Sequence, residues 1–195
     1  MNDKSILIAG VGGQGTLLAG RIIGNAALAA GYDVKVSEVH GMSQRGGSVV
    51  TYVKYGKEIC SPIICRGEAD WMLAFEQMEA YRWSPWLKRD GVLILSTQKV
   101  NPMPVVIGAS EYTADIPGKL SDAGIQVTML DAVGIARDAG NEKASNVAAI
   151  GALASRLEAD GISKELLIGA LTSCLPPKAL PANLSAFRTA VGMYR

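Results

Sequence analysis

Short apolar runs and a helical stripe alternate over the first forty residues. Residues 5–9 form a largely apolar run that predicts a buried strand, and residues 33–39 predict a second strand. Between them, positions spaced three and four apart predict a helix that ends at Gly31. The stripe of this helix consists of Leu17, Leu18, Arg21, Ile22, Ala26 and Ala29. Such a strand–helix–strand unit, with a right-handed crossover, is typical of a parallel α/β sheet.

In the middle of the chain the alternation of strand and helix is interrupted and then resumes. Residues 48–55 alternate like a strand, and Gly56 and Lys57 separate them from residues 58–60, which predicts a hairpin. The elements expected next are a strand over 71–75, a helical stretch through Trp86 and a strand over 91–95. We therefore expect a Rossmann-like, three-layer α/β/α fold with a mostly parallel, mixed sheet and a hairpin insertion.

The last part of the chain predicts helices that pack on this sheet. Expected before them are a loop over 101–104, a short edge strand over 105–107 and a buried strand over 125–130. Three helices follow, of which Ser145 is expected to cap the first, Ser163 the second, while the third covers 184–191. Because no linker or repeat interrupts the chain, we expect one domain over residues 1–195, with the helices of 145–195 packed on it.

Composition removes several classes of function. The chain has 195 residues, of which 49% are hydrophobic, so it can bury a sizeable core. With 19 Lys and Arg against 18 Asp and Glu, the net charge is +1, which argues against nucleic acid as a partner. No apolar run approaches the roughly 18 residues of a spanning helix, and the amino terminus lacks a signal-peptide pattern. We therefore expect a cytoplasmic protein with no membrane partner.

Cysteine and histidine are scarce. Cys60, Cys65 and Cys174 are too few for a four-thiolate zinc site or an iron–sulfur cluster, so we expect no metal site. Cys60 and Cys65 are expected to be small buried side chains. The single histidine, His40, is expected to form hydrogen bonds rather than to transfer protons. We assign no catalytic residue to this chain.

A glycine-rich loop follows the first strand. Residues Gly10, Val11, Gly12, Gly13, Gln14 and Gly15 match the G-x-G-x-x-G pattern between a strand and a helix. Such a loop lets backbone amides at a helix N-terminus approach a phosphate group. The alternative is structural, since glycines also allow the helix to pack closely on the sheet or on another protein. Glu38 is the candidate acidic partner, although it lies further along the chain than in dinucleotide-binding folds.

A second glycine-rich loop follows the second strand, where open α/β sheets place their ligands. It contains Ser43, Gln44, Arg45, Gly46 and Gly47. Arg45 can hold a phosphate or carboxylate group with its planar fork, and Ser43 and Gln44 can add hydrogen bonds. The alternative is a solvated arginine on the way into a hairpin. We expect this loop to lie near the glycine loop.

Two further groups of residues have a functional and a structural interpretation. Glu76 closes a strand, so it either faces the ligand crevice, where it could hold a ligand or an arginine, or caps the following helix. Trp71, Trp83 and Trp86 are expected to be core or interface residues rather than platforms for bases.

Several motifs occur together in the order of one family. They are GVGGQG at residues 10–15, HGMSQRGG at 40–47 and GEAD at 67–70, followed by Phe75–Glu76, Asn101–Pro102, Asn146 with Gly151, and Asn183–Leu184 with Ala186–Phe187. On these residues the chain resembles the gamma-type domain of 2-oxoacid:ferredoxin oxidoreductases, and within that family the small subunits of indolepyruvate-oxidising enzymes. The resemblance covers nearly the whole chain.

The resemblance implies a heteromeric enzyme that decarboxylates an aryl 2-oxoacid, transfers the acyl group to coenzyme A and reduces ferredoxin. Thiamine diphosphate and iron–sulfur clusters would belong to the large partner subunit. Gly12, Gly13, Gln14, Ser43, Gln44 and Arg45 would lie near the subunit interface and the acyl-acceptor pocket. The residue-based alternatives are a stand-alone nucleotide-binding oxidoreductase and a nucleotide-sensing or scaffold module. In the isolated chain, an exposed interface could promote homo-oligomers.

Overall fold

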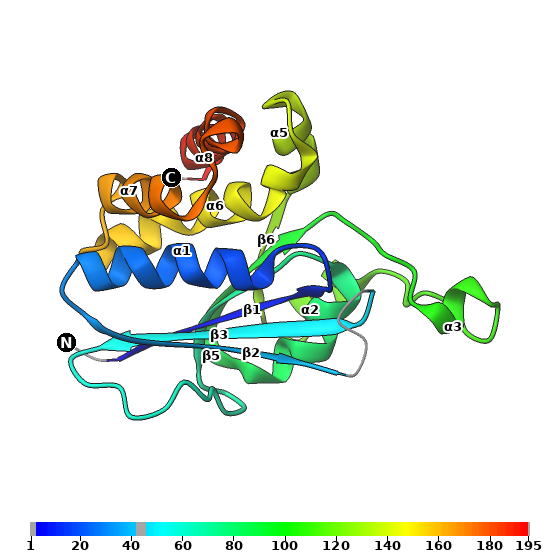
Figure 1. The fold of residues 1–195 in the computed structure, drawn as a ribbon. Helices are drawn as coiled ribbons and strands as arrows, with labels where there is room; N and C mark the ends of the chain where they lie inside the picture. The colour runs from blue at the N-terminus through cyan, green and yellow to red at the C-terminus, as the bar shows by residue number, and fades with distance from the viewer. Residues whose placement is uncertain (1–2, 42–45, 195) are drawn as a thin grey trace.

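The computed structural model describes residues 3–41 and 46–194 of the chain (Figure 1). Its strands are β1 Lys4–Val11, β2 Asp33–His40, β3 Ser48–Gly56, β4 Ala69–Ala74, β5 Leu87–Ser96 and β6 Gln126–Leu130. Its α-helices are α1 Thr16–Ala29, α2 Gln77–Trp83, α3 Met103–Val106, α4 Ile116–Asp122, α5 Ala132–Asp138, α6 Ser145–Ala159, α7 Lys164–Cys174 and α8 Leu180–Met193. Short 3-10 turns are η1 Ser84–Trp86, η2 Glu142–Ala144 and η3 Pro177–Ala179.

The strands form one six-stranded sheet in the order β2-β3-β1-β4-β5-β6. The pairs β1–β4, β4–β5 and β5–β6 are parallel. Strand β3 lies between β1 and β2 and is antiparallel to both. The expected mixed, mostly parallel sheet is therefore confirmed, as is the helix between the first two strands, which ends before Gly31.

Alternation along β1 divides the core between the two faces of the sheet. Ile6 and Ile8 belong to the apolar cluster under α1, α5, α6, α7 and α8. Leu7 and Ala9 belong to the cluster on the opposite face, with α2 and α4. Figure 1 shows α1 and α6 stacked over one face and α2 on the other. The expected three-layer α/β/α arrangement is confirmed, because a strand with side chains on alternate faces is buried on both only when helices cover both.

The sheet corrects two local expectations. The hairpin expected at Gly56 and Lys57 is wrong, because residues 58–60 form no strand and β3 pairs over its length with β2 and β1 instead. The antiparallel hairpin is made by β2 and β3. The edge strand expected over 105–107 is also wrong, because this segment belongs to the short helix α3 and its end.

The closing helices agree with the sequence in number but not in every boundary. Ser163 caps α7 by accepting a hydrogen bond from Leu166 N at 3.3 Å, as expected. Ser145 is the first residue of α6 rather than its cap. Helix α8 begins earlier than expected, and α4 and α5 lie in segments for which no helix was predicted. Among the helices of residues 3–41 and 46–194, none has the length and apolar character needed to cross a bilayer.

Candidate functional site

The glycine loop turns sharply between β1 and α1. Gln14 N donates to Val11 O at 3.0 Å, which closes the turn. Gly15, the residue before α1, has a φ of 80°, in the left-handed region that favours glycine. A Cβ atom at Gly15 would also lie 2.4 Å from Nδ2 of Asn146. The pattern is therefore satisfied by a loop that requires glycine at its junction with the helix.

The side chain of Gln14 points into the protein and fixes this loop. Its Oε1 accepts a hydrogen bond from Val11 N at 2.7 Å. Its Nε2 donates to Phe75 O at 3.1 Å and to Gln98 Oε1 at 2.8 Å. These bonds connect the loop to the ends of β4 and β5, so Gln14 shapes the site from inside.

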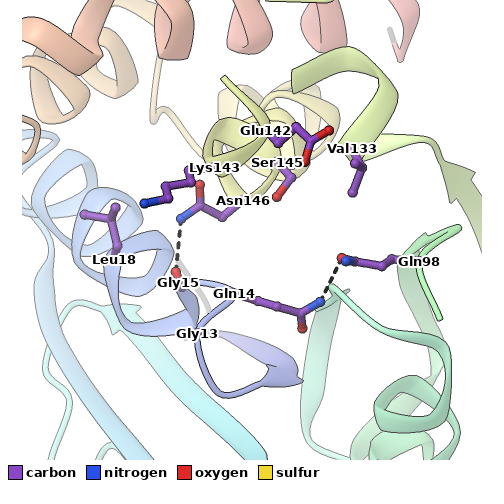
Figure 2. Close-up of a pocket in the computed structure, with 10 residues that line it drawn as sticks. All are labelled: Gly13, Gln14, Gly15, Leu18, Gln98, Val133, Glu142, Lys143, Ser145 and Asn146. Atoms are coloured by element: carbon purple, nitrogen blue, oxygen red, sulfur yellow. Dashed lines mark hydrogen bonds between the residues drawn. The ribbon is translucent and has the colours of Figure 1, made fainter. Parts of the chain in front are cut away.

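A cleft of about 430 Å³ opens between the glycine loop and the start of α6 (Figure 2). Its lining includes Gly13, Leu18, Gln98, Val133, Lys143 and Ser145. In Figure 2 the side chains of Ser145 and Asn146 extend from α6 toward the glycine loop. No side-chain hydrogen bond caps α1 in the described residues, so its first amides are donors without a helical acceptor. The start of α6 differs, because the 3-10 turn η2 runs directly into it: Lys143 N donates to Asn141 Oδ1 at 3.1 Å, and Ser145 N donates to Glu142 O. Helix α6 therefore contributes the positive end of its dipole to the cleft rather than free amide donors.

Asn146 joins the two sides of this cleft. It is buried, with 3% of its surface exposed, and its Nδ2 donates to Gly15 O at 3.2 Å. Its Oδ1 is buried and has no hydrogen-bond partner among the described residues. Because a buried amide oxygen normally has a partner, this atom marks an acceptor that a bound donor could satisfy.

A second cleft, of about 410 Å³, lies on the β2 side of the glycine loop. Glu38 lines it together with Gly12, Gly13 and Thr16. Thr16 Oγ1 lies 3.4 Å from Glu38 Oε2, so the expected proximity of Glu38 to the glycine loop is confirmed. However, β3 separates β1 from β2, whereas dinucleotide-binding folds place these strands side by side.

The second loop meets the glycine loop, as expected. Gly12 N donates to Gly47 O at 2.9 Å, and Gly46 N donates to Gly12 O at 3.3 Å. Ser43, Gln44 and Arg45 lie outside the described residues. His40 is exposed, and its Nδ1 lies 2.9 Å from Gly41 O.

For Glu76 the capping interpretation is confirmed. This carboxylate is 1% exposed and accepts a hydrogen bond from Glu79 N at 3.0 Å at the start of α2. Its other oxygen accepts from Val100 N at 3.1 Å and from the Tyr112 hydroxyl. Burial first, and then this contact, raise the pKa of the Tyr112 hydroxyl above its usual value. Glu76 also borders a cavity of about 130 Å³ next to Gly46 and Gly47.

The cysteines differ from the expectation. Cys60 and Cys65 are exposed, because they lie on the irregular segment between β3 and β4 and not in the core. In the described ranges, no group of three or more His, Cys, Asp or Glu side chains could hold a metal ion. Trp71 is buried, and the rings of Trp83 and Trp86 pack edge to face at 4.6 Å.

Sequence reasoning missed the residues that form the far wall of the larger cleft. Gln98, Lys143 and Ser145 line it without belonging to either glycine-rich loop. Asn146 was part of the resemblance, but no local pattern connects it with Gly15, which is 131 residues earlier. Only the packing of α6 beside α1 brings these segments together.

The fold and the cleft define an α/β domain whose glycine loop faces a second helix N-terminus. The chain belongs to the family described as pyruvate ferredoxin/flavodoxin oxidoreductase, whose model matches residues 5–193. It is 40% identical over 194 residues to the indolepyruvate oxidoreductase subunit IorB of Thermococcus kodakarensis, covering 98% of this chain and 96% of that protein. It is 38% identical over 190 residues to the IorB subunit of Pyrococcus horikoshii, covering 96% and 94%.

Solved structures share the fold. The gamma subunit of a keto/oxoacid ferredoxin oxidoreductase from Geobacter sulfurreducens matches with a TM-score of 0.71 and 26% identity, over 97% of this chain and 96% of that one. A 2-oxoglutarate:ferredoxin oxidoreductase from Magnetococcus marinus, with 2-oxoglutarate, coenzyme A and succinyl-CoA bound, matches with a TM-score of 0.74 and 22% identity. The match covers 100% of this chain and 31% of that chain.

Proposed function

We propose that this chain is the small subunit of a cytoplasmic indolepyruvate:ferredoxin oxidoreductase. Its similarity to IorB subunits over nearly their full length supports this assignment. The complex would break the bond between the carboxylate and the keto carbon of an aryl 2-oxoacid and release CO₂. An electron pair would pass to ferredoxin, the acyl group would join the sulfur of coenzyme A, and the thiol proton would pass to solvent.

Thiamine diphosphate and the iron–sulfur clusters are assigned to a large partner subunit. Three cysteines cannot supply the four thiolates of a cluster, and two of them lie exposed on an irregular segment. The small subunit then contributes binding surface and shape rather than redox chemistry. Its contribution to the reaction is the acceptor side, where coenzyme A must be held.

The observation that carries this role is that the uncapped N-terminus of α1 and the start of α6 line the same cleft beside Asn146. Helix N-termini bind phosphate groups, and Lys143 adds a positive charge to the same lining, where the carboxylate of Glu142 is paired with Arg137 Nε at 2.8 Å. The unpartnered Oδ1 of Asn146 can accept a hydrogen bond from an amide N–H. Coenzyme A carries both kinds of group, phosphates and pantetheine amides, so the cleft fits its donor and acceptor pattern.

The loop residues predicted from the sequence have complementary roles in this proposal. The glycine loop shapes the cleft through Gly10, Gly12, Gly13, Gln14 and Gly15. Glu76 fixes the start of α2 at the neighbouring edge of the sheet. Gly46 and Gly47 of the second loop line the small cavity beside Glu76. From the same loop, Ser43, Gln44 and Arg45 are assigned to binding, and Arg45 would contact coenzyme A or the large subunit. We expect Arg45→Ala to weaken use of coenzyme A or subunit assembly while leaving the fold intact.

Steady-state kinetics of the assembled complex test the acceptor role. Dye reduction with indolepyruvate would be measured at varied coenzyme A for Lys143→Glu and for Lys119→Glu, a control on α4 across the sheet. We expect the first change to raise the KM for coenzyme A about tenfold, because a charge-assisted contact is lost, and to leave the KM for indolepyruvate unchanged. Equal KM values for coenzyme A in both variants would contradict this role.

A stand-alone nucleotide-binding oxidoreductase is the second candidate, because Glu38 and Thr16 line a cleft beside the glycine loop. It requires the isolated chain to bind NAD, NADP or FAD. Calorimetric titration with each nucleotide at millimolar concentration separates the two candidates. Binding by the isolated chain, together with no activity after the large subunit is added, would replace the proposed function.

A further inference from the structure

The segment from Lys99 to Asp115 leaves the end of β5 as an arm that carries α3. Figure 1 shows α3 well away from the layers of the fold. Near its end lie Met103, Val106 and Ile107, here called the arm tip, with 69%, 65% and 68% of their surfaces exposed. They are the most exposed of the large hydrophobic side chains in the described ranges. Neighbouring apolar side chains left in water on one small element indicate a contact surface.

The two legs of the arm are fastened by one buried carboxylate. Glu76 accepts a hydrogen bond from Val100 N, on the outgoing leg, at 3.1 Å, and another from the Tyr112 hydroxyl on the returning leg. The Tyr112 oxygen in turn accepts from Met78 N at 3.2 Å. A second bond at the base joins Gln77 N to Gln98 O at 3.2 Å. The arm is therefore held in position before any partner binds.

The base of the arm is also continuous with the glycine-rich loops. Gln98 accepts the hydrogen bond from Gln14 at 2.8 Å, which connects the arm directly to the glycine loop. Val100 and Pro102 share the small cavity of about 130 Å³ with Gly46 and Gly47 of the second loop. The arm and both loops thus occupy the same edge of the sheet, at the carboxyl ends of the parallel strands.

We propose that the arm tip docks into the large subunit and that Glu76 is the positioning residue for this arm. The proposal rests on the proposed function, which brings the large subunit to the glycine-rich loops. Because the arm starts from those loops, a subunit that covers them also reaches the arm. A surface held in place beforehand loses less conformational entropy on binding, and burial of three apolar side chains supplies the attraction.

Binding of the large subunit to matched serine variants tests this proposal. The arm-tip variant carries Met103→Ser, Val106→Ser and Ile107→Ser, and the control carries Leu28→Ser, Ile63→Ser and Met193→Ser. The control side chains are 55%, 50% and 64% exposed and lie on α1, the segment between β3 and β4, and α8. Because all six are exposed, both variants should unfold at the temperature of the original chain. Association would be measured by titration with the large subunit and by sedimentation.

We expect the arm-tip variant to bind the large subunit at least about 30-fold more weakly than the original chain, and the control to bind within about threefold. If the original chain and the arm-tip variant bind equally, the docking proposal is wrong and the proposed function stands. If the original chain does not bind the large subunit, both the docking proposal and the proposed function are wrong. If the serine changes abolish self-association but leave binding of the large subunit unchanged, a second copy of this chain covers the arm and the proposal is overturned.

Discussion

Replacing Glu76 by alanine should destabilise the protein far more than an ordinary carboxylate substitution. The buried side chain accepts hydrogen bonds from Glu79 N, Val100 N and the Tyr112 hydroxyl. Loss of the helix cap costs about 1 kcal/mol. Each of the other donors left without an acceptor costs about 1 to 2 kcal/mol. Glu76→Ala should therefore lower the free energy of unfolding by about 3 to 5 kcal/mol, or the melting temperature by roughly 6 to 20 °C.

Urea unfolding of matched variants measures this cost. Glu76→Gln keeps the volume and one acceptor oxygen but turns an NH₂ group toward a donor, so it should lose about 1 to 2 kcal/mol. Glu111→Ala, on the exposed part of the same arm, should change stability by less than about 0.5 kcal/mol.

A second measurement is specific to the Glu76–Tyr112 contact. Burial and the Glu76 carboxylate together raise the pKa of the Tyr112 hydroxyl. Glu76→Gln removes the negative charge, so the pKa of Tyr112 should fall toward its ordinary value. Ultraviolet titration, with Tyr112→Phe to identify the signal, records this shift. Unfolding midpoints that are equal in Glu76→Ala and the original chain, together with an unchanged Tyr112 titration, would refute the anchoring role of Glu76.

Two further changes test packing and pH dependence. Gly151→Ala should lower stability by about 1 to 3 kcal/mol although alanine favours helices, because its Cβ would lie 2.6 Å from Phe187 O on α8. Gly169→Ala in α7 has open space and should raise the melting temperature, so a rise in both variants contradicts close packing of α6 on α8. The pKa of Glu68 is lowered, chiefly by the hydrogen bond from the Cys65 N–H group. The ionised Glu68 side chain therefore stabilises the folded protein above about pH 4.5, and this stabilisation is lost as the pH falls through the folded-state pKa. Glu68→Gln should therefore lower the free energy of unfolding by less than about 1 kcal/mol at pH 7, because the side chain is 40% exposed, and should leave it unchanged near pH 3. An equal loss at both pH values would reject this account.

The layers of the fold followed from local patterns, whereas the pairing of β3 did not. Alternation and helical spacing identify which segments are strands and helices, because each pattern is set by neighbouring residues. The turn-like Gly56 and Lys57 predicted a hairpin, but β3 instead pairs with β1 from Ser48 to Tyr55. That pairing joins segments about 44 residues apart, and such a choice depends on which neighbours the whole sheet provides.

The arm shows a second limit of local reasoning. Val105, Val106 and Ile107 are β-branched residues that favour strands. In the structure this segment pairs with no described strand, and Pro104 cannot donate a ladder hydrogen bond. A short helix satisfies its backbone locally, with Ile107 N bonded to Met103 O at 3.0 Å. The wall of the cleft formed by α6 could likewise not be predicted from the glycine loop alone, because it depends on how α6 packs beside α1 and not on neighbouring residues.

The insertion of β3 changes what surrounds a loop that has a dinucleotide-binding pattern. In dinucleotide-binding folds, an acidic residue on the neighbouring strand holds a ribose beside the loop. Here β3 moves β2 outward by one strand spacing, about 4.8 Å, and Glu38 contacts Thr16. On the other side of the loop, the N-terminus of α6 and Asn146 face the N-terminus of α1. Positive helix ends attract anionic oxygens, so the proposed function places the phosphates of coenzyme A on this side of the loop, whereas the side toward β2 is lined by the carboxylate of Glu38.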